Sequence, residues 1–195
     1  MTGPVSKTTI VETCLNGAVE ASRFYDEISG GIQLYEAPEW LLQAEIARAL
    51  GKCCHYVTVE SSVKWLVGAA SAERRGCQIR NKRGRIDIVV WSSSDHPRYL
   101  IEVKKSWDSW SLYEDAKRLR SMLRRGGKFH AGLMVAYATA AREETLDRRF
   151  AETAVNSEAV LVKRLPSMPI DPEDPKSWLW STAVFEVKKA LTIAG

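Results

Sequence analysis

The sequence contains no long apolar run. No stretch of its 195 residues approaches the roughly 20 apolar residues of a membrane span, and residues 1–12 lack the apolar segment of a signal peptide. Hydrophobic residues make up 45% of the chain and charged residues 27%, as in ordinary globular proteins. We therefore expect a soluble cytoplasmic protein of one domain, with a core that needs no disulfide support.

Cysteine and histidine are also scarce. The chain has three histidines and four cysteines (Cys14, Cys53, Cys54 and Cys77) without C-x-x-C spacing, so we expect reduced thiols. Cys53-Cys54-His55 suggests a metal site at first sight, but a closed zinc site needs ligands at spacings that this chain does not supply. A Gly-rich phosphate loop and a G-x-S-x-G motif are absent as well, which leaves few kinds of chemistry open.

Positive charge is concentrated in two blocks. Residues 74–85 and 117–128 each hold six basic residues and no acidic one. Without these blocks the chain has 16 basic residues against 24 acidic ones, a net charge of −8, although the whole chain carries +4. Two basic blocks on an otherwise acidic protein indicate a polyanion such as nucleic acid, and two solvated basic faces are the alternative.

The order of apolar and turn-forming residues predicts an α/β protein. Helices are expected at 13–28, 39–50, 62–73, 111–124 and 141–154, and strands at 55–60, 85–91, 98–104, 132–138 and 159–163. Four prolines make 166–175 a loop, and 178–191 are ordered but of unclear type.

Helix ends are marked by their capping residues. Pro38 and Gly51 flank the second helix. A capping box, Ser111-Leu112-Tyr113-Glu114, begins the fourth, and Gly126-Gly127 ends it.

The two strands around the S-S-S-D-H-P turn place ionisable residues together. If the turn is centred in that segment, paired residue numbers sum to 189, so that Trp91 faces Arg98 and Asp87 faces Glu102. Opposed Cβ atoms on one sheet face lie only about 4.5–5.5 Å apart. Lys104 shares the face of Glu102, because side chains alternate along a strand.

Two carboxylates that face each other are destabilising unless something compensates their charge. Mg²⁺ would do so, since it prefers one or two carboxylates together with water and phosphate oxygens. Such an ion polarises a phosphodiester and activates water, and Lys104 would orient that water or stabilise developing charge. The alternative is a pair of solvated strand edges, with Lys104 neutralising Glu102.

The segments R-G-R-I-D-I-V-V-W and Y-L-I-E-V-K resemble the core of the PD-(D/E)xK, or restriction-endonuclease-like, nuclease superfamily. The resemblance covers about residues 35–138 and departs from the pattern only in having Ile86 where the superfamily has Pro. It implies that Asp87 and Glu102 bind Mg²⁺, for which Mn²⁺ can substitute, that the Val103 carbonyl joins them, and that Lys104 assists hydrolysis.

The resemblance also implies a restriction-endonuclease-like fold. We expect a central mixed sheet of four to five strands flanked by helices. The core would span about residues 35–163, with a helical extension at 1–34 and a further extension at 164–195.

In this superfamily a further acidic residue usually lies on the helix before these strands. At about 100° per residue, Glu39 lies in the middle of the apolar stripe of its helix, where a carboxylate is unfavourable without a partner. We therefore choose Glu39 as the additional catalytic acid. Glu36, Glu45 and Glu60 remain alternatives, and Glu39 would otherwise complement the helix N-terminus.

Basic side chains near the motif are candidates for gripping phosphates. They are Arg80, Lys82, Arg83, Arg85, Lys105, Lys117, Arg120 and Arg124. Asp115 and Arg118 are equally well explained as structural pairs. Trp107 and Trp110 either stack on a base or pack at the rim.

A second E-V-K triplet, Glu186-Val187-Lys188, repeats the one at residues 102–104. The acids upstream of it lie in the proline-rich loop, so we interpret it as chance or as a peripheral element.

The function predicted from sequence is a Mg²⁺-dependent nuclease that cleaves DNA. Two alternatives stay open: a nuclease fold with a weak or inactive site that binds nucleic acid or assembles with a partner, and an enzyme that cleaves RNA. Double-strand cleavage by a single site would call for a homodimer.

Overall fold

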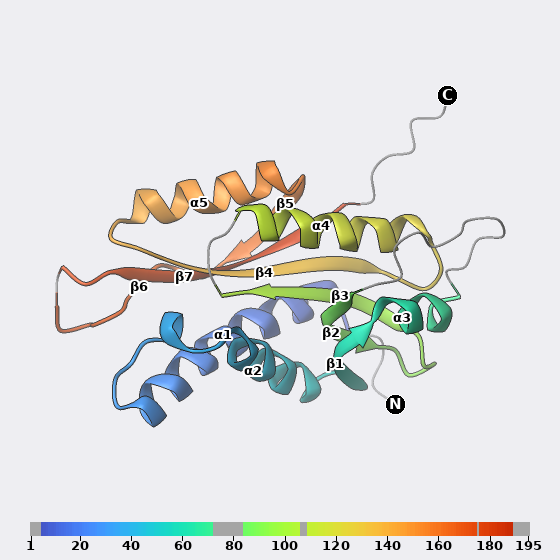
Figure 1. The fold of residues 1–195 in the computed structure, drawn as a ribbon. Coiled ribbons are helices and arrows are strands. Elements are labelled where there is room, and N and C mark those ends of the chain that lie inside the picture. The colour runs from blue at the N-terminus through green and yellow to red at the C-terminus, as the bar shows by residue number, and fades with distance from the viewer. Residues whose placement is uncertain (1–4, 72–83, 106–108, 175, 189–195) are drawn as a thin grey trace.

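The computed structural model describes residues 5–71, 84–105, 109–174 and 176–188. Within them a mixed seven-stranded sheet is flanked by helices on both faces (Figure 1). The strands are β1 (Tyr56–Ser62), β2 (Arg85–Trp91), β3 (Pro97–Lys104), β4 (Ala131–Ala140), β5 (Ala159–Arg164), β6 (Met168–Pro169) and β7 (Leu179–Val187). The helices are α1 (Lys7–Ser29), η1 (Leu34–Glu36, a 3₁₀ turn), α2 (Glu39–Gly51), α3 (Val63–Ala69), α4 (Ser109–Arg124) and α5 (Glu143–Asn156). The α/β class is confirmed, but the sheet has seven strands rather than four to five.

The sheet has the order β1-β2-β3-β4-β7-β5, and the short β6 pairs with β7. β3 and β4 are parallel and are connected through α4, because parallel neighbours need a long crossover, which is usually a helix. The other neighbouring strands are antiparallel.

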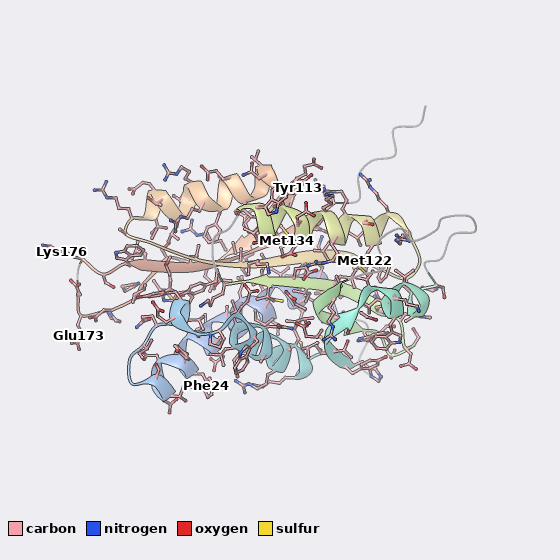
Figure 2. The ribbon with its side chains drawn as sticks, in the orientation of Figure 1. Phe24, Tyr113, Met122, Met134, Glu173 and Lys176 are labelled. Atoms are coloured by element: carbon pink, nitrogen blue, oxygen red, sulfur yellow. The ribbon has the colours of Figure 1, made fainter. Side chains whose placement is uncertain are left out.

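Separate apolar clusters form on the two faces of the sheet. α1 and α2 lie on one face and α4 and α5 on the other (Figure 1). Leu15 and Leu42 belong to the cluster on the first face. Leu119 belongs to the second, where Met122 of α4 and Met134 of β4 lie in the layer between helix and sheet (Figure 2). Among the described residues, no helix is both long and apolar enough to cross a membrane.

α1 is longer than predicted and is part of the core. It begins at Lys7, where the Ser6 hydroxyl accepts a hydrogen bond from the Thr9 N–H. Gly17 lowers helix propensity, but a Cβ at that position would lie 2.7 Å from Ile46 Cα. Glycine therefore allows α1 and α2 to approach closely, and residues 1–34 are more than the extension we expected.

α2 begins where it was predicted and ends differently. Pro38 is the N-cap, and Glu39 is the first helical residue. Gly51 is still helical, and the Lys52 that follows has right-handed backbone angles. The prediction of Gly51 as the C-cap is therefore wrong, because Lys52 is in that position.

The start of α4 also differs from the prediction. The helix begins at Ser109, so Ser111 lies inside it and the predicted capping box does not form the N-terminus. The end is as expected, because Gly126 and Gly127 follow with φ of 76° and 73°, a conformation that favours glycine.

β7 was not foreseen as a strand, and it lies inside the sheet. It pairs antiparallel with β4 along its whole length and with β5 on the other side. Helices cover both faces at this point, so consecutive residues such as Thr182, Ala183 and Val184 are all buried, and no alternating pattern marks the strand. β7 is therefore an inner strand of the sheet, and Glu186 and Val187 of the second E-V-K triplet lie in it.

Candidate active site

The predicted hairpin forms with almost the predicted register. Ile88 pairs with Ile101 and Val90 with Tyr99, as the sum of 189 requires. The register then shifts near the turn, where Trp91 pairs with Pro97 instead of Arg98. This irregularity lies at the turn end of the hairpin, and the ladder keeps the predicted sum as far as Ile88 and Ile101, the residues next to Asp87 and Glu102.

Asp87 of β2 and Glu102 of β3 lie together at that end. The Val103 N–H donates a hydrogen bond of 2.7 Å to Asp87 Oδ2, which holds the Asp87 carboxylate beside the neighbouring Glu102. Burial raises the pKa of Asp87 and the hydrogen bond from Val103 acts in the opposite direction, while the charge of Asp87 raises the pKa of Glu102. The two carboxyl groups therefore interact, as the register predicts.

Glu102 is the most deeply buried acid of the site. It is only 1% exposed, and burial, with the charge of Asp87 added, raises its pKa well above the usual value. Its Oε1 accepts a hydrogen bond of 2.7 Å from Arg118 Nε. Its Oε2 is buried and has no hydrogen-bond partner among the described residues.

Arg118 of α4 links Glu102 to another buried acid, Asp115. One guanidinium nitrogen of Arg118 donates to Asp115 Oδ1 while Nε donates to Glu102. Burial raises the pKa of Asp115, and the nearby Lys104 and Arg118 counteract this effect. The guanidinium thus acts as a counter-charge between two desolvated carboxylates.

Lys104 lies between the two helices that flank the site. Its Nζ donates to Glu39 Oε1 over 3.1 Å and lies 3.4 Å from Asp115 Oδ2. The second contact is an ion pair, since Asp115 Oδ2 lacks a partner with hydrogen-bond geometry. Burial by itself lowers the pKa of Lys104, but Asp115, Glu39 and Asp87 outweigh it, so that the pKa is raised. Lys104 is accordingly a cation at neutral pH.

Glu39 is held at the start of α2 by two contacts from the end of β3. Its Oε1 accepts from Lys104, and its Oε2 accepts from the Lys105 N–H at 3.0 Å. The Lys105 ammonium donates to the carbonyls of Tyr35 and Ala37. Lys105, which we expected to contact nucleic acid, instead fastens the η1–α2 turn to the end of β3.

The other candidate acids lie away from Lys104. Glu36 is exposed in η1, and Glu45 forms an ion pair of 2.6 Å with Arg48. Glu60 accepts a hydrogen bond of 3.2 Å from Gln43 Nε2, which also donates to the Asp87 carbonyl at 2.8 Å. Of the four acids considered from the sequence, Glu39 is the one that contacts Lys104.

The predicted phosphate-gripping residues have different surroundings. Arg80, Lys82, Arg83 and Trp107 lie outside the described residues. Arg85, Lys117 and Arg124 are exposed, and Lys117 forms an ion pair of 3.2 Å with Glu114. Trp110 is 70% exposed at the start of α4.

Arg120 does not face solvent, contrary to the prediction. It is 8% exposed, and one of its guanidinium nitrogens donates to the Ser157 carbonyl over 2.6 Å. A second contact joins it to Glu158 at 3.4 Å. Arg120 thus fixes α4 to the end of α5, and it is withdrawn from the set of nucleic-acid contacts.

The cysteines supply no rival centre. Cys14, Cys53 and Cys54 are free, and Cys77 lies outside the described residues. Burial raises the pKa of the Cys14 thiol, and it raises the pKa of Cys54 to about 12. Among the described residues, no cysteine belongs to a group of three or more His, Cys, Asp or Glu side chains that could hold a metal ion.

The charges of the acid cluster fit a divalent cation. In the part of the chain that the structure describes, no group of three or more His, Cys, Asp or Glu side chains is arranged to hold a metal ion. The connected network nevertheless has four carboxylates and two cations, a formal charge of −2, formed by Glu39, Asp87, Glu102, Asp115, Lys104 and Arg118. Glu102 Oε2 is unpartnered within it. Oxygen donors with surplus negative charge match the preference of Mg²⁺.

Two residues of the cluster were not assigned to the site from the sequence. Asp115 lies three residues after Leu112 and one before Ala116, on the buried stripe of α4, so the helical-angle argument used for Glu39 would have found it. Arg118 had no comparable signal, because its long side chain is able to reach either sheet or solvent.

No family model matches the chain, and searches of curated proteins and of solved structures find no match. The functional argument therefore rests on the geometry of the site.

Proposed function

We propose that this protein is a metal-dependent nuclease that hydrolyses phosphodiester bonds in DNA, with a site of the PD-(D/E)xK type. The observation that carries the proposal is the interacting pair Asp87–Glu102, with an unpartnered buried oxygen on Glu102, beside the cationic Lys104. A charged cluster of this kind is unfavourable in a fold that does not use it. Its cost suggests a ligand that neutralises the carboxylates.

Asp87 and Glu102 would hold the ion, with the Val103 carbonyl as a further donor. Mg²⁺ or Mn²⁺ would supply polarisation of the phosphodiester and a lowered pKa for a bound water. Asp87 Oδ2 already accepts the Val103 N–H, so this hydrogen bond orients the carboxylate before any ligand arrives.

Lys104 acts as a charged hydrogen-bond donor and not as a general base, because its pKa is raised. In hydrolysis, the water oxygen bonds to phosphorus, the bond from phosphorus to the leaving sugar oxygen breaks, and the water proton passes to solvent while the leaving oxygen takes one up. The Lys104 ammonium stabilises the negative charge that develops on the phosphoryl oxygens. Glu39 of α2 and Asp115 of α4 hold that ammonium in place.

One observation favours a second candidate, a nucleic-acid-binding or assembly module without turnover. Arg118 already satisfies one oxygen of Glu102, and an arginine that compensates buried acids is a purely structural solution as well. In that case DNA binding persists in EDTA and no product forms when Mg²⁺ is added.

Supercoiled plasmid incubated with Mg²⁺ or Mn²⁺ tests the proposal, with single-stranded RNA as a parallel substrate. We expect nicked or linear plasmid from the wild-type protein and none from Asp87→Asn or Lys104→Ala. Circular dichroism checks that both variants are folded. Equal cleavage by wild type and both variants contradicts the site assignment, and cleavage of RNA alone would change the substrate.

A further inference from the structure

A cationic cavity lies directly against the acid cluster. It has a volume of about 360 Å³. Its charged lining is formed by Lys117, Arg118 and Glu114 of α4 and by Arg125, which directly follows the helix, and Ser121, Met122 and Val63 complete it. Three cations and one acid line the cavity, and one of these cations, Arg118, is the guanidinium that is already part of the acid cluster. The chemistry of this lining matches a phosphate group, since Arg and Lys are the side chains that bind phosphate oxygens.

Arg118 belongs both to the cavity and to the acid cluster. Its side chain lines the cavity, and its guanidinium simultaneously bridges Glu102 and Asp115. In its present position it holds one of the two oxygens of Glu102, the acid whose other oxygen is unpartnered. A divalent ion at Glu102 would therefore meet a guanidinium on the same carboxylate, and like charges at such short distances repel.

We propose that the cavity binds a backbone phosphate of the nucleic acid and that Arg118 transfers from Glu102 to this phosphate. The transfer frees Glu102 for the metal ion. The inference rests on the proposed function, which it deepens by giving Arg118, Lys117 and Arg125 a substrate phosphate. Arg118 is a positioning residue in this scheme, because it acts through Glu102.

Coupling between the two ligands follows. Without nucleic acid, Arg118 competes with the metal for Glu102, so the ion binds weakly. A phosphate in the cavity removes the competitor, so nucleic acid strengthens metal binding, and by linkage the metal strengthens nucleic-acid binding by the same factor. The site is thereby loaded when substrate is present.

Calorimetric titration with Mg²⁺ at pH 8 tests the competition. We expect Arg118→Gln to bind Mg²⁺ about tenfold more tightly than wild type without DNA, within the range of typical coupling energies. Arg148→Gln is the matched control, since it removes the same charge from the exposed face of α5, where Arg148 lies 3.9 Å from Glu152. The control is expected to leave Mg²⁺ affinity unchanged. Weaker or equal binding of Mg²⁺ by a folded Arg118→Gln protein overturns the inference.

The coupling itself is measured without altering Arg118. In Lys104→Ala protein, which is not expected to turn over, a 12-base-pair DNA duplex should tighten Mg²⁺ binding about tenfold. This arm decides the matter if Arg118→Gln does not fold, and an affinity that the duplex does not change contradicts the inference. Asp87→Asn separates the two claims. Loss of Mg²⁺ binding in Asp87→Asn without an effect of Arg118→Gln leaves the metal site standing and removes only the role of Arg118, whereas binding retained in Asp87→Asn removes the metal site itself.

Discussion

The same triplet, E-V-K, lies at the ends of two strands of this protein in different surroundings: β3 includes all three residues, and β7 ends at the valine. Glu102 on β3 is 1% exposed, interacts with Asp87 and is bridged by Arg118 to Asp115. Glu186 on β7 is opposite Leu133 of β4, and its side chain is 26% exposed and pairs with Lys7 over 2.7 Å. The third residues differ too, since Lys104 is enclosed by two acids whereas Lys188 is exposed.

The comparison teaches that the triplet by itself carries no chemistry. What distinguishes the first copy is the acid across the strand and the helices α2 and α4, which bring Glu39 and Asp115 to the same place. The second copy has a salt bridge of 2.7 Å between partly exposed side chains, of a kind that contributes little to stability.

The largest effect is expected at the acid opposite the first triplet. Asp87→Asn should lower the rate of DNA cleavage by at least about a hundredfold, because it removes a charge on which the metal depends. The same variant should unfold at a higher temperature than wild type in EDTA, since it relieves repulsion with Glu102. Glu186→Gln should retain wild-type cleavage. A plasmid assay and thermal unfolding measure both, and a Glu186→Gln protein as inactive as Asp87→Asn would end the distinction between the copies.

Substitution of the lysines of the two triplets should give a slightly smaller difference in cleavage rate than substitution of the acids. Lys104→Ala removes a cation that stabilises phosphoryl charge, which is worth on the order of a hundredfold in rate, whereas Lys188→Ala should not change the rate. Single-turnover cleavage at saturating protein measures the difference. Equal rates for the two variants would show that Lys104 has no part in the reaction.

The pH dependence of stability sharpens the comparison. Burial raises the folded-state pKa of Glu102 above the unfolded value of about 4.3, so the folded protein binds more protons than the unfolded one between those pKa values. Stability from this group is therefore complete below the unfolded pKa and is lost as the pH rises through the folded pKa. We expect the free energy of unfolding in EDTA to fall with rising pH in wild type, to fall less in Glu102→Gln, and to fall as in wild type in Glu186→Gln. Denaturant unfolding at pH values from 4 to 8 measures this dependence. If the free energy of unfolding of Glu102→Gln falls with pH as steeply as that of wild type, the prediction is wrong.

The smallest effect belongs to the surface pair of the second triplet. Lys7→Met removes the ion-pair partner of Glu186. The side chain of Lys7 is 39% exposed and that of Glu186 is 26% exposed. Such pairs contribute up to about 1 kcal/mol, and added salt should reduce even that. Chemical denaturation with and without 0.5 M NaCl checks the prediction, which a loss of several kcal/mol would contradict.

Local patterns predicted the hairpin and Glu39 well. The register near Asp87 follows from the turn, because a hairpin joins residues that are close in sequence, and the only slip, at Trp91, comes from an irregularity beside the turn. The place of Glu39 on the apolar stripe of α2 indicated a side chain that needs a partner. Lys104 contacts it, although the Glu39 side chain is 40% exposed and not buried as the stripe indicated.

Long-range features were beyond sequence patterns. β7 is buried on both faces, so it lacks the alternation that marks a strand, and its place between β4 and β5 depends on pairing with strands that are distant from it in the sequence. Arg120 looked like one more cation of an exposed stripe, but α5 covers it and Ser157 accepts its hydrogen bond. Which side chains of α4 reach the sheet depends on these packing partners.

Calorimetric titration of Mg²⁺ in wild type, Asp87→Asn and Glu186→Gln tests the central claim most directly. The account predicts a saturable heat of binding in wild type and in Glu186→Gln that is lost in Asp87→Asn. A heat of binding that persists unchanged in Asp87→Asn would contradict it.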